Sequence, residues 1–435
     1  MKILIISDEV WNDRIHGNNM LSNWFEGFNA ELANIYCSPG EPLNSCCKEY
    51  FQITDKMMFK SIMFGRKAGL RLPSCDYSQA KRSNCSEKED KKLYGFLKSI
   101  STDTLRAIRE LLWVLGRYDE DAIEKFIKEI KPDVIFSPRK VTLKILRLER
   151  LVKKFTQIPV VAFTGDTEYS LKQLRFSPVY WLILIFLRSG LRKNAKFYNL
   201  YYTLSEEQAR DYSRIFKVRS KTLFKCHNLA GNSKEKNVGN PIRLVYAGKL
   251  YCNRWKTLAM IVREIKKINS RGRRMVLEIY TRDIVNLKQK QLLDDGKNSF
   301  LMGSVDSKEL TGVYKKVDIA LHVESFDLRN KLLTKYSFST KIIDCLVSTC
   351  AVMAICWEKH AGYMYLEKED AAFCAKDSAS IAETLKMICE NPALIKDYQK
   401  KALECVLRNH SKERIQKSIF EDFSKAIRGG NNQTN

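Results

Sequence analysis

The chain has 435 residues, of which 45% are hydrophobic and 29% charged, and 75 Lys and Arg against 50 Asp and Glu give a formal net charge of +25. This composition is typical of a soluble globular protein, and the length favours two domains. The most lipid-like run, Val179–Leu187, is too short to cross a bilayer. No CxxC pair occurs among the 13 cysteines, so neither a zinc site nor a disulfide framework is indicated.

The first half of the chain alternates short apolar runs with helical patterns, which is typical of a parallel, doubly wound sheet. Strands are predicted for Ile3–Ile6, Val134–Phe136, Pro159–Phe163 and Tyr198–Leu204, and helices for Met20–Leu32, Asp119–Ile130 and Lys140–Phe155. The acidic run Asp119–Asp121 has DxD spacing but opens a helix, so it is interpreted as an acidic first turn, and no metal is predicted.

A polar stretch rich in Gly and Asn, Leu229–Pro241, separates this half from a second one with the same rhythm. There, strands are predicted for Arg243–Tyr246, Val276–Tyr280, Asp318–Val323 and Val352–Ile355, with helices at Lys256–Asn269 and through most of Ile381–Ile427. The predicted fold is α/β, with two Rossmann-like, doubly wound parallel sheets facing a cleft. The predicted boundaries are 1–228, a linker at 229–241, 242–405, and a C-terminal helix in 406–435 that returns to the first domain and ends in a disordered tail.

The stretch YAGKLYCNRWKTL, residues 246–258, places two cations where a strand ends and a helix begins. Lys249 and Arg254 lie at the carboxyl end of the strand, where open α/β sheets bind ligands. Cationic groups beside a helix N-terminus form an anion site. The alternative is that both are exposed cations near a turn.

The stretch KYSFSTKIIDCLVSTCAVMAI, residues 335–355, begins its helix with hydroxyls and a lysine rather than with acids. Ser339 or Thr340 can cap this helix, but Lys341 in the first turn is unfavourable for the helix dipole unless an anion binds there. A phosphate would resolve that conflict, and Asp344, one turn along, could accept hydrogen bonds from a ribose. The alternative is that Lys341 points to solvent and pairs with Asp344.

Two polar segments of the first half are further candidates. The loop after the first strand carries His16, Gly17, Asn18 and Asn19, residue types that suit a backbone approaching a ligand, although a lone histidine is more often structural. Asp166 follows the third predicted strand and is a candidate base or acceptor-orienting group; it could equally cap the next helix.

Together these motifs resemble family 4 glycosyltransferases of the GT-B fold, in particular bacterial enzymes of surface-polysaccharide assembly. The resemblance covers nearly the whole chain and is strongest in YAGKL…NRW, in FLMGSVDSKELTGVYKKVDIALHV and in SFSTKIIDCLVSTCAVMAI. It implies that Gly303 and Val305 lie near the nucleotide base. The family's donor motif has two glutamates separated by seven residues; here Asp344 takes the second place, Tyr336 the first, and Glu324 is a possible substitute.

The resemblance implies transfer of a sugar from a nucleotide diphosphate sugar, UDP- or GDP-linked, to a hydroxyl of a glycan or polyprenyl-linked acceptor, with retention at the anomeric carbon. No cofactor or metal is expected, because Arg254, Lys249 and Lys341 can neutralise the leaving diphosphate, while Asp166 acts on the acceptor side. Alternatives are a sugar-nucleotide epimerase, a phosphorylase, a non-catalytic relative, or a phosphate- or nucleic-acid-binding protein. No nucleic-acid recognition motif is evident, so no nucleic-acid partner is expected.

Positive charge is concentrated in residues 139–225, which hold 19 Lys and Arg against 6 Asp and Glu. The segment SPVYWLILIFLRSGLRKNAKFY combines an apolar strip with Arg188, Arg192, Lys193 and Lys196, which suits an interfacial helix on an anionic membrane. The alternative is a core helix with a basic exposed end. A cytoplasmic protein, peripheral on the inner face of the membrane, is therefore expected.

Overall fold

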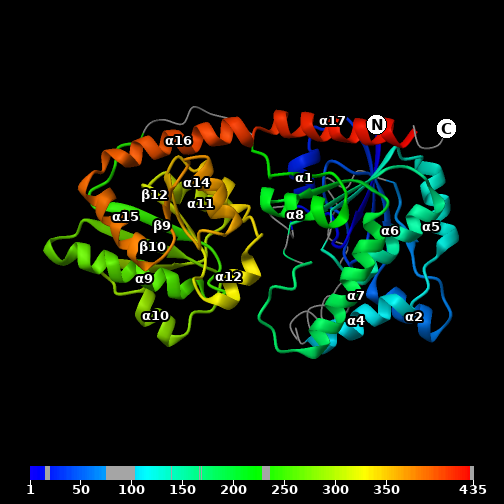
Figure 1. The fold of residues 1–435 in the computed structure, drawn as a ribbon, viewed down its shortest axis with the longest axis horizontal. Coiled ribbons are helices and arrows are strands. Elements are labelled where there is room, and N and C mark those ends of the chain that lie inside the picture. Colours follow the sequence, from blue (N-terminus) through cyan, green and yellow to red (C-terminus); the bar gives the residue numbers. More distant parts are fainter. Residues whose placement is uncertain are drawn as a thin grey trace. The chain divides into compact units, whose positions relative to one another are not determined.

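The computed structural model describes residues 1–14, 20–74, 103–138, 140–165, 167, 169–227 and 236–431. The chain forms two compact units (Figure 1). Unit 1 comprises Met1–Leu171, Arg175–Leu223 and Ile415–Asn435, and unit 2 comprises Lys172–Leu174 and Phe224–Arg414. The boundary between the units after residue 223 lies a few residues before the predicted end of the first domain. The predicted boundary at residue 405 is not a boundary between the units, because this residue lies inside a helix.

The sheet of unit 1 follows the order β4-β3-β2-β1-β5-β6-β7-β8 and is parallel except for the β3–β4 pair. Its central strands are almost wholly buried because their apolar residues face helices on both sides. The strands are β1 (Lys2–Ser7), β2 (Glu31–Tyr36), β3 (Glu49–Gln52), β4 (Leu70–Arg71), β5 (Val134–Pro138), β6 (Val160–Thr164), β7 (Tyr198–Thr203) and β8 (Ser220–Thr222).

Several helices of unit 1 are capped at their N-termini by the side chain of the preceding residue. Thr54, Asp119, Thr142, Ser177 and Ser205 each accept a hydrogen bond from an amide of the first turn. The helices are α1 (Met20–Phe25), α2 (Asp55–Met63), α4 (Asp103–Leu115), α5 (Glu120–Ile130), α6 (Leu143–Phe155), α7 (Pro178–Ala195), α8 (Glu206–Phe216) and α17 (Lys412–Asn431).

The helix predicted for Met20–Leu32 is too long. Helix α1 ends at Phe25, and Gly27, with φ 74°, turns the chain into β2. A positive φ costs glycine little, so this residue permits the turn that ends the helix. The prediction missed β2 because its apolar residues continue the spacing of the preceding helix.

Helix α17 packs on unit 1 although it is the last helix of the chain. The buried carboxylate of Asp422 accepts hydrogen bonds from the Tyr202 hydroxyl and the Lys221 ammonium, each at 2.7 Å. The Phe423 ring lies 5.5 Å from that of Phe136, between ring centroids, in the core of the unit. Unit 1 is thus closed by residues from both ends of the chain.

The sheet of unit 2 is wholly parallel and follows the order β11-β10-β9-β12-β13-β14. The strands are β9 (Ile242–Ala247), β10 (Met275–Tyr280), β11 (Ser299–Gly303), β12 (Ile319–Val323), β13 (Ala351–Ile355) and β14 (Phe373–Ala375). The helices are α9 (Arg254–Ile268), η2 (Asn269–Arg271), α10 (Leu287–Leu293), α11 (Ser307–Tyr314), α12 (Leu328–Thr334), α13 (Lys341–Leu346), α14 (Ala361–Lys368), α15 (Ser378–Glu390) and α16 (Ala393–Asn409).

The α/β class and the two parallel sheets predicted from the sequence are confirmed. In both sheets the chain first winds to one side and then returns to wind to the other, so each has a switch point: β1/β5 in unit 1 and β9/β12 in unit 2. Open α/β sheets bind ligands outside the carboxyl ends of the strands at such points. Within the described ranges, no helix is both long and apolar enough to cross a membrane.

Candidate functional site

The switch point of unit 2 holds a buried ion pair between two residues predicted from the sequence. Arg254 begins α9, which follows β9, and Glu324 follows β12 directly. The Arg254 guanidinium donates from Nε to Glu324 Oε2 at 3.0 Å and from Nη2 to Oε1 at 2.5 Å. The two side chains are only 13% and 4% exposed. A strand end and a helix start, adjacent at the switch point, thus bring these groups together.

Several contacts fix the orientation of this pair. Thr257 Oγ1 donates to the Glu324 carbonyl at 2.9 Å, and the Arg254 guanidinium lies 4.6 Å from the centre of the Tyr251 ring. Burial opposes the charge of Arg254, but the Glu324 carboxylate outweighs this effect and raises the pKa of Arg254. Arg254 is therefore a permanent and oriented cation. Lys249, whose ammonium lies 5.9 Å from the same Tyr251 ring, is exposed in the preceding loop.

Lys341 reaches from α13 to the end of β9. Its ammonium donates to the Ala247 carbonyl at 3.0 Å. Gly248 leaves the room for this contact, since a Cβ at that position would lie 2.8 Å from Lys341 Nζ. Lys341 is exposed as a residue, but the surrounding protein partly shields its ammonium from solvent. This burial of the ammonium, followed by the nearby Arg254 guanidinium, lowers the pKa of Lys341. Positive charge is thus gathered at the β9 end, and an anion there would be stabilised.

The start of α13 differs in detail from the predicted cap. Helix α13 begins at Lys341, and Thr340, at the N-cap, makes no capping hydrogen bond through its side chain. Ser339 Oγ instead accepts from the Lys341 amide at 3.3 Å. Asp344 pairs with Lys225 rather than with Lys341, at 2.7 Å between Oδ1 and Nζ. The Asp344 side chain is 35% exposed, so it is accessible from solvent.

Gly303 is the last residue of β11, an edge strand of the sheet, and Val305 follows two residues later. Gly303 has φ 80°, a conformation that favours glycine, and its carbonyl accepts from the Thr281 amide at 2.8 Å. The Val305 carbonyl accepts from Arg282 at 3.4 Å. Both positions therefore lie at the carboxyl edge of the sheet, and their role beside the nucleotide base stays a prediction.

The remaining predicted residues, His16, Gly17, Asn18, Asn19 and Asp166, lie outside the described residues. Their proposed acceptor-side roles stay predictions.

Unit 1 has a buried charged pair at its own switch point that the sequence reasoning missed. Asp8 follows β1, and its carboxylate pairs with the ammonium of Lys144, a residue of α6 that also donates to the Cys37 carbonyl at 3.1 Å. Lys144 is almost completely buried; burial disfavours its charge, but the Asp8 carboxylate raises its pKa above the usual value. The sequence signal for Asp8 was an acidic residue directly after a strand, the same feature that made Asp166 a candidate.

Three buried residues near Glu324 are spaced as metal ligands: His322, Cys356 and His360, with one ligand atom of each within 4.8 Å of the others. Burial first, and then the neighbouring His360 and Arg254, lower the pKa of His322. Nε2 of neither histidine has a hydrogen-bond partner among the residues that the structure describes. However, His360 Nδ1 accepts from the Gly362 amide at 3.1 Å, so the proton of this neutral ring is on Nε2. His360 therefore serves first as the cap of α14.

No model of a known protein family matches the sequence, and no curated protein matches it. Solved structures match it in fold over nearly its whole length. Sucrose-phosphate synthase from Thermosynechococcus elongatus is 11% identical, with a TM-score of 0.61 over 99% of this chain and 100% of that chain. Anabaena HepE, in complex with UDP and glucose, is 12% identical, with a TM-score of 0.56 over 98% and 100%.

A third match is the G117R mutant of S. aureus TarM in complex with fondaparinux, alpha-GlcNAc-glycerol and UDP, which is 11% identical, with a TM-score of 0.56 over 97% of this chain and 99% of that chain. At such low identity the likeness concerns the fold alone. The two parallel-sheet units and these matches show that the chain has the GT-B fold of glycosyltransferases.

Proposed function

We propose that the protein is a glycosyltransferase that moves a sugar from a nucleotide diphosphate sugar to a hydroxyl of a glycan or lipid-linked acceptor. The observation that carries the proposal is the convergence of Arg254, Lys341 and Lys249 on the carboxyl end of β9, at the switch point of unit 2. A diphosphate bound there would meet fixed positive charge. The presence of UDP in two structures of the same fold supports the nucleotide, with UDP as the first choice of donor.

In this proposal the cations stabilise the leaving group. As the bond between the anomeric carbon and the diphosphate oxygen breaks, negative charge grows on that oxygen, and the acceptor oxygen bonds to the anomeric carbon. The acceptor's proton ends on the released nucleotide diphosphate or in solvent. Preorganised cations favour this charge without moving, which lowers the barrier to transfer. Retention at the anomeric carbon, and membership of family 4 in polysaccharide or glycolipid synthesis, belong to this proposal through the sequence resemblance.

Other residues receive narrower roles in the proposal. Asp344, accessible and one turn into α13, would accept hydrogen bonds from the ribose, and the β11 end with Gly303 and Val305 would face the base. Glu324 holds Arg254 and is therefore assigned to positioning this cation rather than to the sugar's hydroxyls.

Slow hydrolysis of UDP-, GDP- and ADP-sugars, followed by release of the nucleotide diphosphate, tests the function. We expect one donor to be hydrolysed by the wild type and Arg254→Ala to lower that rate on the order of 100- to 1,000-fold. Chromatography of the sugar product separates transfer from epimerisation, since an epimerase would return a nucleotide sugar with changed configuration. Absence of both turnover and nucleotide binding across the panel would remove the proposal.

A further inference from the structure

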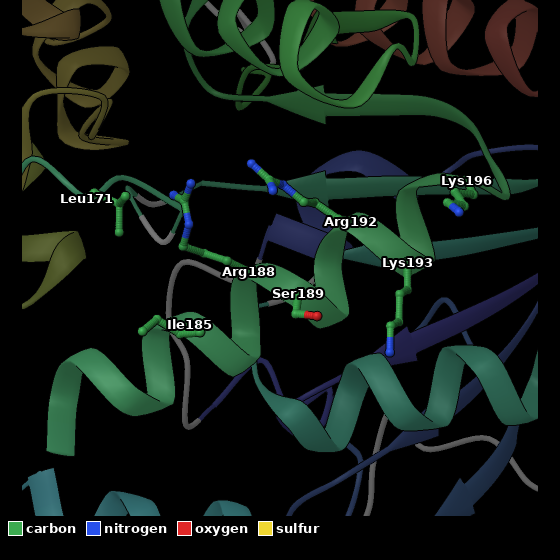
Figure 2. A pocket seen from close by; sticks show the side chains of 7 residues that line it. All are labelled: Leu171, Ile185, Arg188, Ser189, Arg192, Lys193 and Lys196. Atoms are coloured by element: carbon green, nitrogen blue, oxygen red, sulfur yellow. The ribbon is translucent and has the colours of Figure 1, made fainter.

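Helix α7 carries a surface hollow lined mainly by cations. Figure 2 shows Arg188, Ser189, Arg192, Lys193 and Lys196 lining it, with Leu171 and Ile185 at its other end. Arg188, Arg192 and Lys196 follow one another at intervals of four residues and so share one side of the helix, and Lys193 lies three residues before Lys196. Like charges so spaced repel one another, and an anion in the hollow would relieve that repulsion.

Two of these cations are held in place by one buried aromatic residue. The Arg188 guanidinium lies 3.9 Å from the centre of the Tyr169 ring and donates to the Tyr169 carbonyl, and Arg192 Nε donates to the Tyr169 hydroxyl at 2.5 Å. Tyr169 is itself fixed against the rings of Tyr212 and Phe216, 6.2 and 4.9 Å away between centroids. The charge of Arg188 and Arg192 is therefore preorganised, whereas Lys193 and Lys196 are exposed.

The same helix exposes large apolar side chains one turn before the cations. Leu182, Ile185 and Phe186 are 56%, 59% and 58% exposed. The neighbouring helix α4 packs against α7 and also carries exposed apolar side chains, Ile108, Leu111, Val114 and Leu115. Apolar side chains beside fixed cations match the chemistry of a bilayer surface, where acyl chains lie below anionic headgroups.

We propose that the α7 hollow binds the phosphate of an anionic phospholipid headgroup while Leu182, Ile185 and Phe186 enter the outer part of the same bilayer. The phosphate oxygens accept from Arg188, Arg192, Lys193 and Lys196, and the apolar turn leaves water. The site rests on unit 1 alone and stands independently of the sugar chemistry of unit 2.

Flotation with lipid vesicles tests the site. At low salt, the wild-type protein is expected to float with vesicles of phosphatidylcholine and phosphatidylglycerol, and not with phosphatidylcholine alone. Lys193→Gln/Lys196→Gln should weaken partitioning about 30-fold, since each cation near an anionic surface contributes roughly fivefold. Phe186→Ser should weaken binding with the charge unchanged. Thermal unfolding of each variant verifies that it is folded.

The matched control is Lys417→Gln/Lys425→Gln, which removes the same charge from exposed positions of α17 in unit 1. Equal loss of binding in the two double variants would overturn the site, because net charge alone would then explain the attraction. Binding of inorganic phosphate at the hollow without flotation would overturn the lipid as its source. Because flotation needs no nucleotide sugar, this result and the hydrolysis assay succeed or fail separately.

Discussion

Arg254 and Glu324 face each other as a buried pair at the switch point of unit 2, joined by two hydrogen bonds of 3.0 and 2.5 Å. Arg254→Ala is expected to abolish most donor hydrolysis and also to reduce the free energy of unfolding by about 3–5 kcal/mol, because it leaves Glu324 buried without its partner. Urea unfolding measures the second effect.

The double variant Arg254→Met/Glu324→Gln separates the two roles of the pair. Stability should largely return, since no buried charge remains, whereas hydrolysis should stay low because the cation is missing. Recovery of hydrolysis together with stability would mean that Arg254 only supports the fold.

Gly248 lies against the Lys341 ammonium, and a Cβ there would also approach the Tyr246 hydroxyl to 2.8 Å. We expect Gly248→Ala to displace the ammonium and to weaken UDP binding about tenfold, as Lys341→Met should through loss of one charge-assisted hydrogen bond. Isothermal titration calorimetry measures the affinity. Gly312→Ala in α11 is the control, because a Cβ there meets nothing within 4 Å; wild-type affinity in Gly248→Ala would argue against a phosphate beside Lys341.

Asp344 is assigned to the ribose although its carboxylate pairs with Lys225. Asp344→Asn is expected to reduce the preference for UDP over its 2′,3′-dideoxy analogue about tenfold, the effect of one hydrogen bond to a charged group. Lys225→Met should keep that preference, since it leaves the carboxylate in place. If both variants discriminate between the two nucleotides as the wild type does, Asp344 does not contact the ribose.

The buried His410 is expected to make the stability of the protein depend on pH. Burial lowers the pKa of His410 from 6.5 to about 4, although a hydrogen bond to the Lys225 carbonyl acts in the opposite direction. Between these values the unfolded chain binds a proton that the folded protein does not, so His410 makes stability fall as the pH falls from 6.5 to 4, on the order of 3 kcal/mol in total.

Denaturant unfolding of the wild type and of His410→Gln across this range tests the effect. The difference in unfolding free energy between the two proteins should change with pH over the window and be constant above it. A constant difference throughout would assign the loss of stability to other groups.

Apolar runs predicted most of the sheet in unit 2 well, because parallel strands buried on both faces read as continuous hydrophobic stretches. Residues 352–355 were predicted as a strand and form most of β13. Strand β2 was missed because residues 32–36 fit either a helix or a strand by spacing alone, and only the turn at Gly27 separates them.

The sequence singled out Arg254, Glu324 and Asp344 but not the pairs that these residues form. Arg254 and Glu324 are 70 positions apart, and Lys225 and Asp344 are 119 apart. Such pairs depend on strand order, which local patterns do not encode. The hydroxyls before Lys341 suggested a cap, yet Thr340 adopts helical φ and ψ, from which its side chain makes no capping bond.

The anchoring of α17 on unit 1 has a consequence for synthesis. Unit 2 is inserted into unit 1, because residues 224–414 separate Leu223 from Ile415. A nascent chain therefore finishes all of unit 2 before Asp422 can reach Tyr202 and Lys221, and before Phe423 can fill its place beside Phe136. Domains generally fold as they emerge from the ribosome, so unit 1 is the first unit to appear and the last to be completed. A chain terminated before α17 would leave unit 1 incomplete.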